Sequence, residues 1–125
     1  MKKRLSDKEE EIMGFFWDNG DMFVREVVDN YPDPKPHFNT VATFVRGLEA
    51  KGFLTHQKIG NSYRYSAAVS PDAYGRATLP ALVRRLFGGS GLNMVSMLVE
   101  NEKIPADELR RLADMMEQER RERDG

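Results

Sequence analysis

Residues suited to catalysis or metal binding are sparse in this chain of 125 residues. Histidine occurs only at His37 and His56, which are far apart in the sequence, and cysteine is absent. No carboxylate cluster accompanies either histidine to complete a metal site. A phosphate loop, a serine-nucleophile motif and a two-histidine metal motif are also missing. We therefore expect no catalytic residue, no metal and no cofactor, and predict that the protein is not an enzyme.

A different set of side chains, on a predicted helix from Asn39 to Ala50, could act by hydrogen bonding. Its apolar positions follow the i, i+3, i+4, i+7 pattern of a buried helix face: Val41, Phe44, Val45 and Leu48. The opposite face holds Asn39, Thr43, Arg46 and Ala50, with Thr40 and Gly47 at one edge. Small polar groups beside one arginine let a helix enter the major groove of DNA and reach base edges. We therefore predict DNA contacts by Asn39, Thr40, Thr43 and Arg46. The alternative is that the two threonines are simply exposed to solvent and that Arg46 pairs with a nearby carboxylate.

A short hairpin is predicted directly after this helix. Residues 53–59 and 63–67 are rich in strand-forming side chains and flank the tip Gly60-Asn61-Ser62. Lys58 and Arg64 flank this tip, where a hairpin can place amides and cations beside phosphates. We include Lys58, Asn61 and Arg64 among the candidate DNA contacts. The alternative is that Lys58 and Arg64 only protect the edges of exposed strands.

The charge distribution agrees with this placement. The net charge of the chain is −1, which alone does not indicate a nucleic-acid partner. Residues 34–67, however, carry five basic side chains and one acidic side chain. Residues 1–33 carry five basic and nine acidic side chains, and residues 68–125 carry nine basic and ten acidic side chains. Phosphate neutralisation needs basic side chains facing the backbone. Any DNA contact is therefore expected in the middle segment.

Three helices precede the hairpin, in the order typical of a winged helix-turn-helix. Ser6 and Glu9 form a capping-box pattern that begins the first helix, and Asn19-Gly20 ends it. A second helix from Val24 to Tyr31 ends at a proline-rich loop. Asn39 is the expected N-cap of the third helix, which Lys51-Gly52 closes. The fold class we predict is mainly α with a small β-hairpin.

The C-terminal part is predicted to be helical. One helix is predicted to begin at Ser70-Pro71, to bend at Pro80 and to end at Gly88-Gly89. A second helix is predicted over Leu92–Val99. The last helix begins at Pro105, and we expect its charged end to fray. In the last helix Leu109, Leu112 and Met116 are expected to face inward. These short helices carry more apolar side chains than they can bury alone, which favours burial against a second copy. We predict a winged-helix DNA-binding domain at 1–69 and a helical dimerisation region at 70–125.

Composition places the protein inside the cell. With 40% hydrophobic and 31% charged residues the chain should fold as a globular protein. No apolar run approaches the roughly 18 residues of a membrane span, and the basic start leads into a polar segment and not into an apolar signal. We expect a cytoplasmic protein that is not inserted in a membrane.

In the order and spacing of these motifs the chain resembles the penicillinase repressor family over nearly its whole length. The matching segments are residues 5–13 (LSDKEEEIM) with Trp17, 24–27 (VREV), 39–43 (NTVAT), Leu48 with 51–54 (KGFL), 60–65 (GNSYRY) and 86–90 (LFGGS). The resemblance implies a winged-helix repressor that dimerises through its C-terminal helices and binds double-stranded operator DNA that is palindromic. Thr40 and Thr43 match the T-x-x-T of the family's recognition helix, and Arg64 lies in its wing.

Some positions depart from the family pattern. Gly47 stands where the common pattern has an arginine before the leucine matched by Leu48, and Arg46 stands one place earlier. A shift of about 100° around the helix redirects that side chain, so the family's operator sequence is not carried over.

Antibiotic-responsive members are cleaved in the dimerisation region in response to a membrane sensor protease. The corresponding region here is Met97-Leu98, in place of the Asn-Phe pair of cleaved members, which disfavours this route of induction. The lack of cysteine disfavours direct copper sensing.

The sequence thus supports a sequence-specific repressor that binds DNA as a homodimer. The alternative is a winged helix that serves only as a protein-interaction module, because a fold does not fix a function. The exposed face of the third predicted helix is the feature that separates the two.

Overall fold

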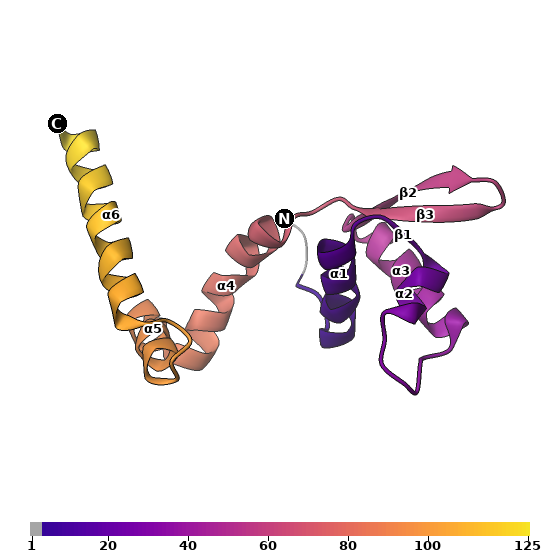
Figure 1. The fold of residues 1–125 in the computed structure, drawn as a ribbon, viewed down its shortest axis with the longest axis horizontal. Helices are drawn as coiled ribbons and strands as arrows, with labels where there is room; N and C mark the ends of the chain where they lie inside the picture. The colour runs from indigo at the N-terminus through magenta and orange to yellow at the C-terminus, as the bar shows by residue number, and fades with distance from the viewer. Residues whose placement is uncertain (1–3) are drawn as a thin grey trace. The chain divides into compact units, whose positions relative to one another are not determined.

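The computed structural model describes residues 4–125, which form six helices and one small sheet (Figure 1). The elements are α1 Asp7–Asn19, β1 Met22–Phe23, α2 Val24–Asp29, α3 Phe38–Ala50, β2 Leu54–Ile59, β3 Ser62–Ala67, α4 Pro71–Phe87, α5 Gly91–Glu100 and α6 Ala106–Asp124. The predicted fold class, mainly helical with a hairpin after the third helix, is confirmed. The chain divides into an N-terminal unit up to Thr78 and a C-terminal unit, Leu79–Gly125.

Local signals in the sequence fix the first helix. The Ser6 hydroxyl accepts a hydrogen bond from the Glu9 amide, and the Glu9 carboxylate accepts one from the Ser6 amide, so the predicted capping box is present. Gly20 ends α1 with a φ of 83°, a conformation that glycine adopts without strain. The helix buries Ile12, Met13 and Phe16 and so presents one face to the core.

The start of α3 differs from the prediction. The helix begins at Phe38, and its N-cap is His37, whose Nδ1 accepts a hydrogen bond from the Asn39 amide at 3.1 Å. The expected N-cap, Asn39, therefore lies within the first turn. An imidazole nitrogen can satisfy a free helix amide as a side-chain oxygen does, and the side chain of Asn39 remains exposed.

The sheet contains one strand more than the predicted hairpin. Its order is β1-β3-β2, with antiparallel pairing throughout. The added strand β1 pairs Met22 with Tyr65 and Phe23 with Arg64. Because β1 is only two residues long, it carries no alternating pattern that the sequence could reveal. In the N-terminal unit the β2–β3 hairpin, the wing, extends beyond the helices (Figure 1).

The helices α1, α2 and α3 and the base of the sheet enclose one hydrophobic core. Its fully buried members come from every one of these elements: Ile12, Met13, Val27, Val41, Val45, Leu48, Phe53 and Leu54. Tyr74, near the start of α4, also joins this core, where its ring meets Phe53 edge to face at 5.6 Å. The first part of α4 is thereby fixed to the N-terminal unit.

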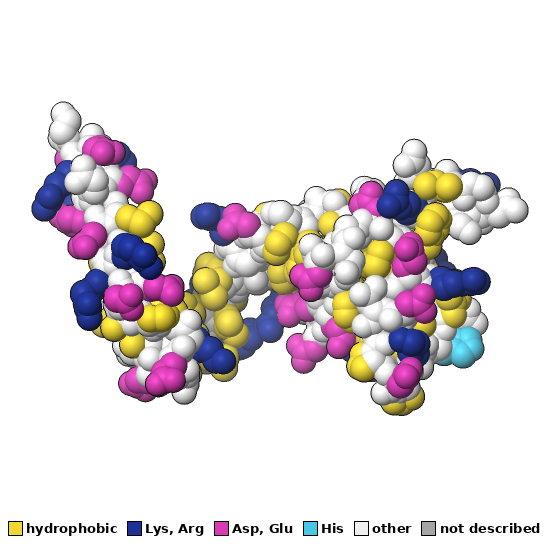
Figure 2. Space-filling view, in the orientation of Figure 1, with side chains coloured by type: hydrophobic (Ala, Val, Ile, Leu, Met, Phe, Trp, Pro, Cys, Tyr) yellow, Lys and Arg dark blue, Asp and Glu magenta, His cyan; other side chains and the backbone are white. Residues whose placement is uncertain are grey.

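The C-terminal unit has no such core. Among Leu79–Gly125 no side chain is buried, and hydrophobic side chains lie on the surface of its helices (Figure 2). Leu112 and Met116, expected to face inward, are 51% and 62% exposed. The tail of α6 is helical to Asp124, contrary to the expected fraying, and i,i+4 pairs such as Arg121–Glu117 lie along it. None of the helices described is long and apolar enough to span a membrane.

Candidate nucleic-acid interface

The candidate DNA-contact surface lies on one face of α3, and the opposite face is buried. One face buries Val41, Ala42, Val45 and Leu48 in the core. That burial fixes the rotation of the helix about its axis, and the side chains of Asn39, Thr40, Thr43 and Arg46 are consequently exposed together. The structure thus brings all four predicted helix residues onto one exposed surface.

Hydrogen bonds order this exposed face. The Thr43 hydroxyl donates to the Asn39 carbonyl at 2.9 Å, and the Arg46 guanidinium donates to the Thr43 hydroxyl at 3.4 Å. Within residues 4–125 no carboxylate forms an ion pair with Arg46. The guanidinium keeps donors that are free to bind another acceptor.

The wing separates its two predicted cations. Lys58 lies opposite Tyr63 in the β2–β3 register, whereas Arg64 lies opposite Gln57. Directly paired residues share a face and neighbouring residues alternate, so Lys58 and Arg64 lie on opposite faces of the hairpin. Lys58 shares the face of Tyr65, which packs in the core. Asn61 is exposed at the tip between the strands.

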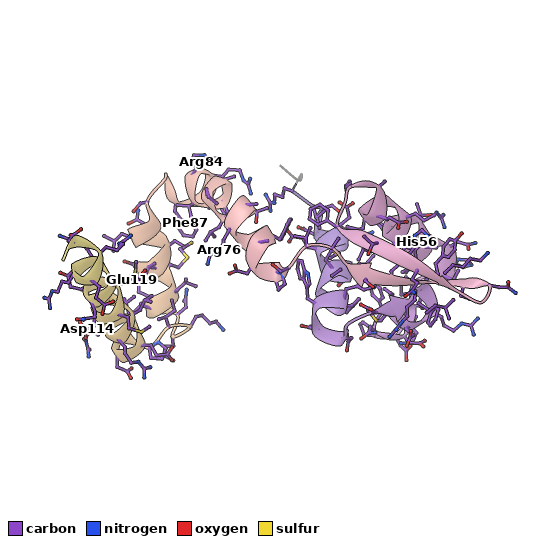
Figure 3. All side chains as sticks on the ribbon, turned by 90° about the horizontal axis from the view of Figure 1, so that it is seen from above. His56, Arg76, Arg84, Phe87, Asp114 and Glu119 are labelled. Carbon is purple, nitrogen blue, oxygen red and sulfur yellow. The ribbon has the colours of Figure 1, made fainter. Side chains whose placement is uncertain are left out.

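A contact that the sequence analysis missed joins α3 to the wing. His56, which is labelled in Figure 3, places its Nδ1 2.5 Å from a carboxylate oxygen of Glu49 in the last turn of α3. Its imidazole stacks on Tyr63 with ring centroids 4.3 Å apart. The wing is thus tied to the recognition helix by a polar contact and by ring stacking. Two single polar residues, one on a helix and one on a strand, form no sequence motif, so this pairing gave no signal.

Another tie holds α3 against α1. The Lys51 ammonium, at the C-cap of α3, lies 2.6 Å from the carboxylate of Glu9, which is buried. Burial alone would raise the pKa of Glu9, but hydrogen bonds from Lys51 and Ser6 and the charge of Lys51 together hold it below its ordinary value. The carboxylate is therefore charged at neutral pH and positions the end of the recognition helix.

The start of α4 is held by two further side chains. The Tyr74 hydroxyl accepts a hydrogen bond from the Leu5 amide at 2.9 Å and donates to Glu10 at 2.5 Å. Burial, and then the hydrogen bond to Glu10, raise the pKa of Tyr74 to about 12, so the phenol remains a donor. The Trp17 indole donates to the Val69 carbonyl at 2.8 Å, which fixes the segment that leads into α4.

A groove of about 570 Å³ lies between α2, α3 and the wing. Its walls are Phe23, Val24, Arg25, Glu26, Phe38, Ala42, Arg46, Ile59, Asn61, Ser62, Tyr63 and Tyr65. Of the predicted contacts, the groove brings Arg46 and Asn61 together; Lys58 and Arg64 do not line it. Burial, and then the charge of Glu49, raise the pKa of Tyr65 while Arg46 lowers it, which places this phenol within reach of both charges.

The remaining predicted residues belong to the C-terminal unit. Met97 and Leu98 lie within α5, where Met97 is exposed and Leu98 is partly buried. No cluster of three histidine or carboxylate side chains in the part of the chain that the structure describes could hold a metal ion.

Two comparisons with known proteins bear on what this surface binds. A family model described as "Penicillinase repressor" matches residues 5–118, which include all the described helices and strands up to most of α6. The chain is also similar to a protein named "Penicillinase repressor" from Bacillus licheniformis, with 26% identity over 125 residues that cover 94% of each chain. The similarity therefore extends over both units.

Proposed function

Since the chain belongs to the penicillinase repressor family and is thus a DNA-binding transcriptional repressor, we propose that it binds a palindromic operator as a homodimer. The observation that carries this proposal is the exposed face of α3. It offers small polar side chains and one unpaired guanidinium on a helix whose other face is buried. A helix face of this kind can enter the major groove and reach base edges.

The side chains of α3 have separate tasks in this proposal. Arg46 binds a base edge or an adjacent phosphate, because its guanidinium can donate two parallel hydrogen bonds. Thr40, Thr43 and Asn39 lie beside it and contact bases or the backbone at short range. The hydrogen bond from Arg46 to Thr43 holds the guanidinium over this face before DNA binds.

The wing supplies contacts to phosphates. Asn61 at its tip and Lys58 beside it contact the backbone next to the site read by α3. Arg64 points to the other face of the hairpin, so we assign it to a different phosphate from the one that Lys58 binds.

The C-terminal helices form the proposed dimer interface. Large hydrophobic side chains are exposed along all three: Leu79, Leu86, Leu92, Met97, Leu112, Met115 and Met116. A second copy presents the same surface, and two-fold symmetry then repeats the recognition helix for each half of a palindrome. We assign residues 1–69 to DNA binding and residues 70–125 to dimerisation. The boundary between the two compact units lies a little later, after Thr78 within α4.

The family resemblance suggests induction by a membrane sensor protease, but the residues Met97-Leu98 at the corresponding bond disfavour this route. The Met97-Leu98 bond lies in the regular helix α5. A protease needs an extended substrate backbone, so cleavage here requires local unfolding of this helix.

The experiment that tests the proposal is selection of DNA from a random pool by the purified protein. The affinity for the selected duplex is then compared with that for a scrambled duplex of the same length at several salt concentrations. We expect a palindromic sequence and much tighter binding to it than to the scramble, with both affinities falling as salt rises. Enrichment of no sequence would contradict the proposal and would favour a module that binds protein.

A further inference from the structure

The groove between α2, α3 and the wing contains a cation that the proposed interface does not include, Arg25. This residue lies in the first turn of α2 and lines the groove together with Arg46 of α3 and Asn61 of the wing tip. Among residues 4–125 neither arginine forms an ion pair with a carboxylate. Two free guanidinium groups from different elements thus face one hollow.

The charge of the groove is positive despite one carboxylate in its wall. Glu26 is the acidic residue among the lining side chains, against Arg25 and Arg46. One oxygen of Glu26 already accepts a hydrogen bond from the Phe23 amide at 2.9 Å, so this carboxylate has a partner at the N-cap of α2. The groove therefore favours an anion over a cation.

Apolar side chains line the groove together with these charges. Between residues 4 and 78, the large hydrophobic side chains that are exposed are Phe38, Ile59 and Tyr63, at 48%, 44% and 47%. All three line this groove. Exposed apolar side chains gathered at one place indicate contact with a partner that is itself partly apolar.

We propose that this groove seats one sugar–phosphate strand of the operator, with Arg25 bound to a phosphate and Phe38 and Ile59 against deoxyribose. A nucleic-acid strand presents both anionic and apolar groups, and the walls of the groove offer partners for both. The inference rests on the proposed function: with α3 in the major groove and the wing tip at the adjacent phosphates, the strand between them passes between the two elements that border the groove. Arg25 then positions the protein on any duplex and reads no base.

Removal of the charge tests the role of Arg25. In Arg25→Gln, the slope of log affinity against log salt should fall by about 1, because one fewer counterion is released. The loss should be equal for the selected operator and for the scrambled duplex, so their ratio stays constant. Arg25→Lys keeps the charge and should keep the slope. Arg76→Gln is the matched control, because Arg76 pairs with Asp72 and does not line the groove.

An uncharged substitution tests the apolar wall. Ile59→Ser should weaken binding to both duplexes by roughly three- to tenfold, the effect of leaving a few tens of Å² of apolar surface in water, with no change of slope. Thermal unfolding followed by Trp17 fluorescence checks that each variant keeps the fold of the N-terminal unit.

The outcomes separate this inference from the proposed function. An unchanged slope in Arg25→Gln overturns the phosphate contact, and a loss confined to the operator assigns Arg25 to base reading and also overturns it. Unaltered affinity in Ile59→Ser overturns the sugar contact. If the wild-type protein has no preferred sequence, the proposed function is wrong. The salt slope measured on the scrambled duplex then still tests whether Arg25 binds a phosphate. Absence of any DNA binding overturns both.

Discussion

The two units of this molecule differ in how far they bury their apolar side chains. The N-terminal unit closes a core in which eight side chains, from α1 to β2, are almost inaccessible to water. The C-terminal unit, which consists of helices without a sheet, buries no side chain at all. The first unit can therefore hold the exposed face of α3 in place by itself, whereas the apolar side chains of the second unit favour burial against another surface. In the dimer that we propose, association through the second unit is expected to raise the affinity for DNA.

The largest effect should come from a cavity in the N-terminal core. Phe53 is fully buried between α3 and β2, where it contacts Tyr74. We expect Phe53→Ala to lower the free energy of unfolding by about 3–5 kcal/mol through lost burial and the cavity left behind. Chemical denaturation followed by Trp17 fluorescence measures this, since Trp17 is the one tryptophan of the chain and belongs to this unit.

Phe38→Ala is the matched control, because the same residue type is half exposed there. If Phe38→Ala lowered the free energy of unfolding as much as Phe53→Ala does, the distinction between a closed core and an exposed surface in this unit would be wrong.

The next effect tests the uncovered surface of the C-terminal unit. Leu112 and Met116 lie one turn apart on α6 and are both exposed. The double variant Leu112→Ser/Met116→Ser should shift the protein to monomers in sedimentation and weaken operator binding by about 10²-fold or more, because the two half-sites are no longer linked. The fluorescence of Trp17 should report an intact N-terminal unit.

Glu119→Ser, on the same helix (Figure 3), is the control and should remain dimeric. A dimer mass retained by the double variant would show that this part of α6 lies outside the interface.

A smaller effect is expected at the recognition surface, where one contact is lost and the fold is kept. Arg46→Ala should cost about 1–3 kcal/mol in binding to the selected operator, and Thr43→Ala should cost less than Arg46→Ala. Titration of both duplexes with each variant measures the cost and its sequence dependence. Equal affinity of wild type and both variants would remove these side chains from the interface, even though the helix that carries them is well ordered.

The sequence predicted most of the N-terminal unit because its signals are local. The capping box at Ser6, the apolar spacing from Val41 to Leu48 and the turn at Gly60 each depend on a few adjacent residues, and all three features are present. The four exposed polar residues of α3 followed from the same periodicity.

Features that depend on distant residues were not predicted. The pairing of β1 with β3, the contact of His56 with Glu49, and the groove that holds Arg25 all arise only when separate elements pack together. The N-cap was misplaced by two residues because a histidine, which is a less common cap, acts through its ring nitrogen. Lys58 and Arg64 lie on opposite faces of the hairpin because of the register between its strands. The turn residues alone did not determine this register, so the separation was not predicted.

The smallest effect concerns ion pairs, which also differ between the two units. Glu9 is buried and pairs with Lys51, whereas Glu117 and Arg121 on α6 are both exposed. Because the folded-state pKa of Glu9 lies below its ordinary value of 4.5, this pair stabilises the fold above that pH, and the contribution is lost as the pH falls through the folded-state pKa. Glu9→Gln should therefore lower stability at neutral pH and weaken its decline in acid. Since Lys51 is partly exposed and screened by solvent, we expect a loss of about 1 kcal/mol.

Glu117→Gln provides the comparison for Glu9→Gln, because an exposed i,i+4 pair contributes little. Denaturation of both variants between pH 3 and pH 7 measures the difference, with these pH limits set at roughly one and a half units below and well above the ordinary carboxyl pKa. If both variants gave the same pH profile as the wild type, the tie between α1 and the end of α3 would not be electrostatic. The end of α3 would then be held against α1 by its buried apolar face, and the Glu9–Lys51 pair would have no energetic consequence.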